Sequence, residues 1–135
     1  MYTEIQIWPR FSETDANGHI NNTVPAVWFE EGRSRLIYES AKVSPAAIIA
    51  HIDIDYLAEM RFRLPVTIRT GIERFGEKSY TYYQEAWQDG HLCARARAVC
   101  AGWDHKRKST IRISDEIRQG LAAYLFDEAL RGRTR

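Results

Sequence analysis

Polar and apolar side chains alternate in two separate parts of the chain, which is the period of a β-strand with one buried face. The first part is YTEIQIW at residues 2–8, and Pro9 is expected to end it. The second is AIIAHIDIDYLAEM, which begins at Ala47 and carries apolar side chains at even positions as far as Tyr56. Three more strand-like runs follow: PVTIRTGIERFG at 65–76, KSYTYYQEAW at 78–87 and HLCARARAVCAGW at 91–103.

Between the first two strands the period changes to that of a helix. Val24, Trp28, Gly32 and Leu36 are four residues apart and would line one face. Gly32 on this apolar stripe lowers the helix propensity by roughly 1 kcal/mol relative to Ala, so close packing against another element is the expected compensation. The charged residues of the same stretch are expected to lie largely off the stripe: Glu30, Glu31, Arg33 and Arg35.

A second helix is expected near the C-terminus. Ser114 is a favourable N-cap residue, and Asp115 and Glu116 suit the positive end of a helix dipole. Ile117, Leu121 and Leu125 would then lie on its apolar face.

The order of elements is therefore strand, helix, four strands, helix. Short turns between strands favour antiparallel pairing, and a long helix with an apolar stripe must bury that stripe against a sheet. We predict an α+β fold in which a five-stranded antiparallel sheet wraps a long central helix, with a second helix at the C-terminus. Nothing indicates a linker or a repeat, so residues 1–135 are expected to form a single domain.

The composition narrows the class of protein. Hydrophobic residues make up 44% and charged residues 27% of the 135 positions, as in a soluble globular domain. A formal net charge of +1 gives no general indication of nucleic-acid binding. No apolar run approaches the roughly 18–20 residues that a membrane span needs, and the N-terminus lacks the apolar region of a signal peptide.

The two cysteines, Cys93 and Cys100, are separated by an odd step that points them to opposite faces of a strand. We expect two buried, unpaired thiols in a reduced, cytoplasmic protein. No His or Cys cluster has the spacing of a metal site, so neither a metal nor a redox cofactor is expected.

The segment FSETDANGHINNTVP at residues 11–25 is polar and directly precedes the long helix. An Asp followed by Asn and Gly in a loop most often serves the turn itself, with its side chain bonded to its own backbone. Gly18 suits a sharp turn, and Asn21, Asn22 or Thr23 can cap the helix. From the residues alone, a structural turn is the simpler interpretation of Asp15.

The same segment resembles a known family. TDANGHINN at 14–22, followed by WFE at 28–30 and Arg33, is similar to the motif of hotdog-fold acyl-CoA thioesterases, in the branch of 4-hydroxybenzoyl-CoA thioesterase. The stretches IDIDYLAEMRFRLPVTIRTGIERFGEKSYTYYQEAW and WDHKRKSTIRISDEIRQGL also resemble that branch, so essentially the whole chain is covered. The resemblance implies one hotdog domain over residues 1–135. At Pro25 many relatives have a tyrosine, and no role of that tyrosine is carried over.

The activity that the resemblance implies is hydrolysis of an acyl-CoA thioester to a carboxylic acid and free coenzyme A. The family counterpart of Asp15 is the catalytic carboxylate, acting as nucleophile or as general base. A helix start offers unpaired N–H groups and positive potential, so the backbone amides of Asn22 and Thr23 are the expected oxyanion donors. His19 is expected to orient the loop or to contact the substrate, with a structural, hydrogen-bonded histidine as the alternative.

Further substrate contacts are expected around the loop and on the long strand. Gly18 and Asn21 belong to the loop itself. The resemblance places Tyr56 near the acyl pocket or the subunit contact, and Trp28 belongs to a set of aromatic residues that line the pocket or the core.

Three basic residues are candidates for holding the phosphates of coenzyme A: Arg61, Arg63 and Lys78. Arg and Lys suit this task because they form charge-assisted hydrogen bonds to phosphate oxygens. For any single one of them, a solvated charge beside a turn is the simpler interpretation.

The resemblance also implies a homo-oligomer. Family members pair their sheets edge to edge into dimers and commonly associate into tetramers, with active sites at the subunit interface. The expected partners are an acyl-CoA substrate and further copies of the chain, and no cofactor is implied beyond the coenzyme A of the substrate.

Three other functions compete with this one. A thioesterase acting on an acyl carrier protein would use the basic residues against an acidic carrier surface. A non-catalytic acyl-binding module can share the same fold. A hotdog dehydratase is disfavoured, because the long helix carries no histidine.

Overall fold

The computed structural model describes residues 1–40 and 47–134 and contains the expected helices and strands in the expected order. The strands are β1 (Thr3–Ile7), β2 (Ala47–Tyr56), β3 (Val66–Phe75), β4 (Ser79–Gln88), β5 (His91–Asp104) and the short β6 (Ser109–Thr110). The helices are α1 (Val24–Ser40) and α2 (Asp115–Ala122), with the 3-10 turns η1 (Phe11–Glu13) and η2 (Glu128–Leu130).

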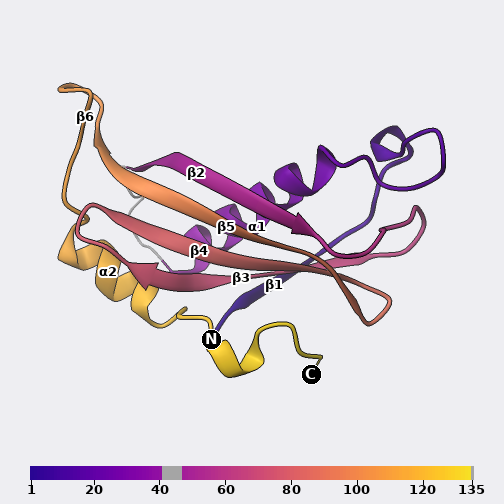
Figure 1. Ribbon diagram of the computed structural model, residues 1–135. Coiled ribbons are helices and arrows are strands. Elements are labelled where there is room, and N and C mark those ends of the chain that lie inside the picture. The colour runs from indigo at the N-terminus through magenta and orange to yellow at the C-terminus, as the bar shows by residue number, and fades with distance from the viewer. Residues whose placement is uncertain (41–46, 135) are drawn as a thin grey trace.

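The sheet has the order β1-β3-β4-β5-β2, and all of its pairings are antiparallel. β3, β4 and β5 form a meander, as their short connections predict. β2 does not pair with β3, its successor in the chain, but lies beside β5 at the opposite edge (Figure 1). The predicted five-stranded antiparallel sheet is confirmed, and β6 adds a small hairpin to the end of β5.

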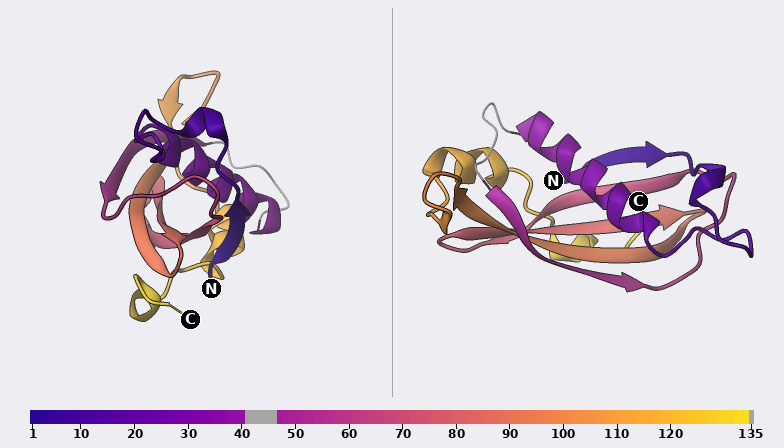
Figure 2. Two further views of the ribbon diagram at one scale, coloured as in Figure 1. Left: turned by 90° about the vertical axis from the view of Figure 1, so that its right-hand side faces the viewer. Right: turned by 90° about the horizontal axis from the view of Figure 1, so that it is seen from above.

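α1 lies along one face of the sheet, which curves around it (Figure 2). The predicted apolar stripe is confirmed at Trp28, Gly32 and Leu36, all of which are buried. Arg33 was expected off the stripe, and this was wrong: its side chain is buried, because it finds a polar partner, Gln84, in the core.

Gly32 sets how closely α1 approaches the sheet. A Cβ atom at this position would lie 2.5 Å from Thr70 Oγ1 and 2.8 Å from Ile68 Cγ2, both on β3. These distances are shorter than any side chain tolerates without movement, so the predicted compensation for glycine in the helix, close packing, is confirmed.

The core has two parts along α1. Near the start of the helix, Trp28 and Phe29 pack with Met60, Val66 and Ile68. Toward the end of α1 lies a second cluster, to which α2 contributes Leu121. Its buried members are Leu36, Ile72, Tyr80, Tyr82, Ala98, Cys100, Ile113 and Leu121. α2 begins as predicted, because the Ser114 hydroxyl accepts the Ile117 N–H at 3.3 Å. It ends at Ala122, so the expected place of Leu125 on its apolar face was wrong, and Leu125 is 46% exposed.

The outer face of the sheet is covered by the chain that follows α2. Phe126 stacks on Tyr2 and meets Tyr83 edge to face, with ring centroids 4.7 and 5.0 Å apart. The buried Glu85 carboxylate accepts hydrogen bonds from the Tyr83 hydroxyl, at 2.8 Å, and from the backbone N–H of Gly132. Of the five long strands, β2 is the most exposed. The buried face expected for it from the alternation was wrong for the single chain, because β2 is an edge strand and Ile48 and Ile52 remain 38% and 37% exposed.

Replacing Gly32 with Ala should lower the free energy of unfolding. Ala gains about 1 kcal/mol of helix propensity, but overpacking a core typically costs about 1–3 kcal/mol. Thr70 cannot easily yield, because its hydroxyl oxygen lies 2.9 Å from Gln84 Nε2, which donates to it. Urea denaturation measures the change.

Ser34→Ala is the matched control, since Ser34 is exposed on the same helix. It should leave stability unchanged or slightly raised. A Gly32→Ala protein as stable as the Ser34→Ala protein would contradict the close approach of α1 to β3.

Candidate active site

The loop between β1 and α1 folds around the side chain of Asp15. One carboxylate oxygen, Oδ1, accepts hydrogen bonds from the backbone N–H groups of Asn17, at 2.7 Å, and His19, at 3.1 Å. The Asp15 N–H in turn donates to the His19 carbonyl at 2.8 Å. Gly18 has a φ of 79°, a left-handed conformation that glycine adopts without strain. The predicted turn at Asp15 and Gly18 is therefore present.

The second oxygen of Asp15 is not part of this turn. Oδ2 has no hydrogen-bond partner among residues 1–40 and 47–134, and the side chain is exposed. The structural and the catalytic interpretation of Asp15 are therefore compatible, because Oδ1 holds the carboxylate while Oδ2 stays available.

The loop is fastened to the segment that follows β2. The Ile20 N–H donates to the Met60 carbonyl at 2.9 Å, and His19 forms an isolated antiparallel bridge with Arg61. His19 Nε2 also lies 3.1 Å from a carboxylate oxygen of Glu59. His19 thus holds the loop in place through both its backbone and its side chain.

Asn21 caps the start of α1. Its side-chain Oδ1 accepts the Thr23 N–H at 3.1 Å and the Thr23 hydroxyl at 3.2 Å, and its carbonyl accepts the Val24 N–H. The Thr23 amide, expected as an oxyanion donor, is therefore already engaged. The Asn22 amide donates to no acceptor within the described part of the chain, which makes it the more available of the two expected donors.

A cleft of about 450 Å³ opens beside Asn22, between the start of α1 and the end of β2. Its lining is His19, Ile20, Asn22, Pro25, Tyr56, Leu57, Ala58, Glu59 and Met60. The Tyr56 hydroxyl donates to the Asn22 carbonyl and so ties β2 to the helix start. Asp15 does not line this cleft but adjoins it through two bonds with the His19 backbone: its Oδ1 accepts the His19 N–H, and its own N–H donates to the His19 carbonyl.

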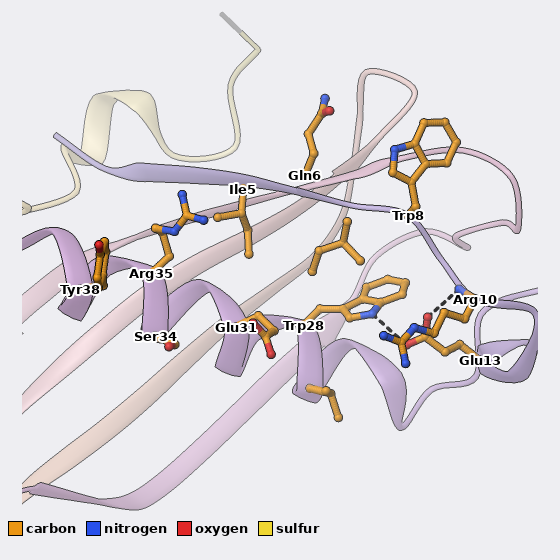
Figure 3. A pocket seen from close by; sticks show the side chains of 12 residues that line it. Ile5, Gln6, Trp8, Arg10, Glu13, Trp28, Glu31, Ser34, Arg35 and Tyr38 are labelled. Carbon is orange, nitrogen blue, oxygen red and sulfur yellow. Dashed lines mark hydrogen bonds between the residues drawn. The ribbon is translucent and has the colours of Figure 1, made fainter.

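Trp28 lies elsewhere than the cleft. It lines a groove of about 950 Å³ between β1 and α1, shown in Figure 3, and its indole N–H donates to Glu13 at 3.0 Å. Glu13 also accepts the Arg10 N–H, so this acid is structural. The groove is larger than the cleft but includes neither Asp15 nor Tyr56, so size alone does not locate the site.

The three basic candidates separate into two groups. Arg61 and Arg63 are exposed on the segment next to the loop. Lys78 lies in the turn between β3 and β4, at the other end of the sheet. The ten residues of β3 place these ends roughly 30 Å apart at about 3.3 Å per residue. Lys78 therefore cannot reach a ligand in the cleft of its own chain.

Both cysteines are unpaired and buried, as predicted. Burial raises the pKa of the Cys93 and Cys100 thiols above the ordinary value. Neither is then a thiolate at neutral pH, which disfavours a cysteine nucleophile.

A sequence profile of the thioesterase-like superfamily matches residues 9–121. The chain belongs to this superfamily. A predicted thioesterase from Bacillus stearothermophilus is 36% identical, with a TM-score of 0.87 over 94% of this chain and 98% of that one.

Two more distant structures show the same fold. One is a thioesterase from Thermus thermophilus complexed with coenzyme A and Zn, at 19% identity and a TM-score of 0.81 over 87% of this chain and 95% of that one. The other is a 4-hydroxybenzoyl-CoA thioesterase in which an aspartate is replaced by asparagine, complexed with 4-hydroxybenzoyl-CoA. It is 13% identical, with a TM-score of 0.80 over 89% of this chain and 98% of that one.

These similarities confirm the hotdog fold, the resemblance to the 4-hydroxybenzoyl-CoA thioesterase branch and the enzyme class, a thioester hydrolase. Within residues 1–40 and 47–134, no group of three or more His, Cys, Asp or Glu side chains is placed to hold a metal ion. In the same residues, no helix has the length and apolar character to cross a membrane.

Several residues of this thioesterase-like site were not predicted. Glu59 pairs with His19, and Gln88 of β4 binds both the N–H and the carbonyl of Arg61 through its side-chain amide. Both residues act across long sequence separations, and neither has a local pattern that would reveal it. The one signal in the sequence is that Glu59 lies three residues after Tyr56, which was already a candidate.

Tyr56→Phe should loosen the helix start, because it removes the hydroxyl that donates to the Asn22 carbonyl. Losing one such bond is worth about 0.5–1.5 kcal/mol, so amides in residues 17–24 should exchange roughly two- to tenfold faster. Hydrogen exchange followed by mass spectrometry measures this.

Tyr38→Phe serves as the control, because Tyr38 is 84% exposed on α1. It should leave exchange in residues 17–24 unchanged. If Tyr56→Phe also leaves it unchanged, the tyrosine does not hold the helix start in this thioesterase.

Proposed function

We propose that the chain is an acyl-CoA thioesterase that converts an acyl-CoA and water into a carboxylic acid and coenzyme A. The observation that carries this proposal is that only one of the two carboxylate oxygens of Asp15 is hydrogen-bonded in the described residues. Its Oδ1 is fixed by two backbone amides, while Oδ2 has no partner in the described residues and lies in the same turn as the cleft-lining His19. A group held in this way needs little reorganisation before it reacts.

Two routes are consistent with this carboxylate. In the first, Oδ2 of Asp15 attacks the thioester carbonyl carbon, the C–S bond breaks, and coenzyme A leaves as a thiolate that takes up a proton. Water then hydrolyses the mixed anhydride and restores the carboxylate. In the second, the carboxylate removes a proton from the water molecule that attacks the same carbon.

Both routes pass through a tetrahedral intermediate with a negatively charged oxygen. We assign the Asn22 amide as the donor to this oxygen, because the Thr23 amide is used by the Asn21 cap. One such donor commonly contributes about 3–4 kcal/mol, and the positive end of the α1 dipole adds to it.

Two similar structures support coenzyme A as the carrier of the acyl group, since one contains coenzyme A and the other 4-hydroxybenzoyl-CoA. The second of them carries an aspartate-to-asparagine replacement, which supports the choice of an aspartate as the residue to test. Arg61 and Arg63 are the proposed phosphate contacts next to the cleft, and His19 and Gly18 act by shaping the loop.

A homodimer through β2 completes this proposal. Ile48, Ile49 and Ile52 are 38%, 46% and 37% exposed on an edge strand, which is a hazard for aggregation unless it is covered. Two copies of β2 related by a twofold axis must pair antiparallel, and further association would give a tetramer.

That pairing has two consequences for the site. It brings the sheet end that carries Lys78 in one subunit to the Asp15 loop of the other, where Lys78 can contact a phosphate. It also shields the exposed Asp15 from bulk water. We place the enzyme in the cytoplasm, where its two thiols stay reduced.

Asp15→Asn should lower kcat for acyl-CoA hydrolysis by about 10²–10⁴-fold, the range typical for loss of a positioned base. The melting temperature should change little, because the asparagine oxygen can still accept the Asn17 and His19 amides. Release of coenzyme A is followed with a thiol reagent across straight, branched and aromatic acyl-CoA esters, with an acyl-carrier-protein thioester in parallel.

Asp127→Asn is the matched control. Its Oδ1 accepts the Ala129 amide at 2.9 Å in a turn of the segment that follows α2, away from the cleft and from the sheet end that carries Lys78. This variant should hydrolyse at the wild-type rate. If the Asp15→Asn protein turns over at the wild-type rate, Asp15 has no part in the mechanism. If the wild-type protein hydrolyses the acyl-carrier-protein thioester much faster than the acyl-CoA esters, the carrier of the acyl group is that protein and not coenzyme A.

A further inference from the structure

Arg33 is a buried cation without a counter-charge in the described residues. It lies on the sheet-facing side of α1 with 8% of its surface exposed. One guanidinium nitrogen donates to Gln84 Oε1 at 3.0 Å, and Gln84 is itself held by the Phe29 carbonyl and the Thr70 hydroxyl. In residues 1–40 and 47–134, Arg33 takes part in no ion pair.

No carboxylate in residues 1–40 and 47–134 forms an ion pair that would neutralise it. Glu30 lines the same pocket one turn earlier, but it is exposed to solvent. Residues 41–46, AKVSPA, contain no carboxylate in their sequence. A buried charge without a partner is costly, and such groups are found where they bind something.

A pocket of about 300 Å³ adjoins Arg33, between α1 and the start of β2. Ile37 and Ile48 give it apolar sides, and Tyr80, Tyr82 and Cys100 form its inner wall. Burial raises the pKa of both tyrosines and of the cysteine, so these three groups stay neutral. Arg33 therefore lies beside neutral hydroxyl and thiol groups, while Glu30 lines the solvent-exposed side of the pocket.

This pocket and the cleft at Asn22 both lie between α1 and β2. The cleft is lined by Pro25 at the start of α1 and Tyr56 at the end of β2. The pocket is lined by Arg33, eight residues further into α1, and by Ile48 near the start of β2. Eight residues of helix between Pro25 and Arg33 correspond to roughly 12 Å. A chain attached at the Asn22 end and lying between α1 and β2 would direct its far end toward Arg33.

We propose that Arg33 binds a carboxylate at the far end of the acyl group, so that the preferred substrates are CoA esters of medium-length dicarboxylic acids. The inference rests on the proposed function, because it assumes that the thioester carbonyl lies at Asn22. A guanidinium suits a terminal carboxylate because it can bind both oxygens, and the surrounding hydroxyls add donors.

The test compares CoA esters that differ only at the far end. Adipyl-CoA is matched with hexanoyl-CoA, and suberyl-CoA with octanoyl-CoA. The wild-type protein should prefer the carboxylated member of at least one pair by about tenfold or more in kcat/KM, the effect of one charge-assisted bond. Equal rates within both pairs, or a preference for the methyl-ended esters, would overturn the inference while leaving thioester hydrolysis intact.

Arg33→Met should abolish this preference while keeping hydrolysis of hexanoyl-CoA or octanoyl-CoA, and Arg33→Lys should retain part of it. Arg35→Met is the control, because Arg35 lines the groove on the β1 side of α1. It should keep the full preference. If a folded Arg33→Met protein still prefers the carboxylated esters as strongly as the wild type, Arg33 does not recognise the carboxylate. If that variant does not fold, the comparison of esters with the wild-type protein still tests the inference.

A binding measurement distinguishes failure of this inference from failure of the proposed function. Non-hydrolysable thioether analogues of suberyl-CoA and octanoyl-CoA are titrated into wild-type protein by calorimetry. The carboxylated analogue should bind about tenfold more tightly even if no ester is hydrolysed. Equal affinities would overturn the role of Arg33, whereas absent hydrolysis with this affinity difference would overturn only the proposed function.

Discussion

The site depends on the two hydrogen bonds that Asp15 Oδ1 accepts from the amides of Asn17 and His19. Bonds to a charged acceptor contribute about 1.5–3 kcal/mol each, enough to hold a short polar loop in one conformation. They bring His19 against Glu59 and the segment after β2, and they leave the second carboxylate oxygen unused. A turn that the sequence predicts therefore also fixes the carboxylate that we propose as the reactive group.

The start of α1 likewise has some polar groups bonded within the chain and others left available. The first N–H groups of a helix lack intrahelical partners, and Pro25 in the first turn of α1 has none to satisfy. Asn21 accepts the Val24 N–H at its carbonyl and the Thr23 N–H, just before the helix, at its side chain. The capping residue thereby decides which neighbouring amide remains available for a substrate oxygen. Tyr56 bonds the Asn22 carbonyl from β2, so the helix start, the loop and the edge strand meet at one cleft.

Much of the fold was predictable because its signals are local. The alternation at 47–56, the spacing that ends at Leu36 and the cap at Ser114 each depend on neighbours within a few residues, and the three elements that they predict are confirmed. The buried face expected for 47–56 is not, because most of its side chains are exposed in the single chain. The glycine in α1 was also informative, because a helix interior tolerates Gly only where packing requires it.

The remainder depends on contacts between distant parts of the chain. Nothing in the alternation of β2 indicates that it lies beside β5 instead of β3, since both edges suit a strand with one apolar face. Arg33 looked like a solvated charge because its partner, Gln84, lies far along the chain. Trp28 was grouped with the site for its aromatic ring and Lys78 for its charge. Within one chain the first packs toward β1 and the second lies at the other end of the sheet, positions that depend on tertiary contacts.

The most direct measurement is a crystal structure of the Asp15→Asn protein with an uncleaved acyl-CoA. The account predicts that the thioester carbonyl oxygen accepts the Asn22 N–H and that its carbon lies beside the side chain at position 15. A thioester bound in the groove between β1 and α1, away from Asn22, would contradict it.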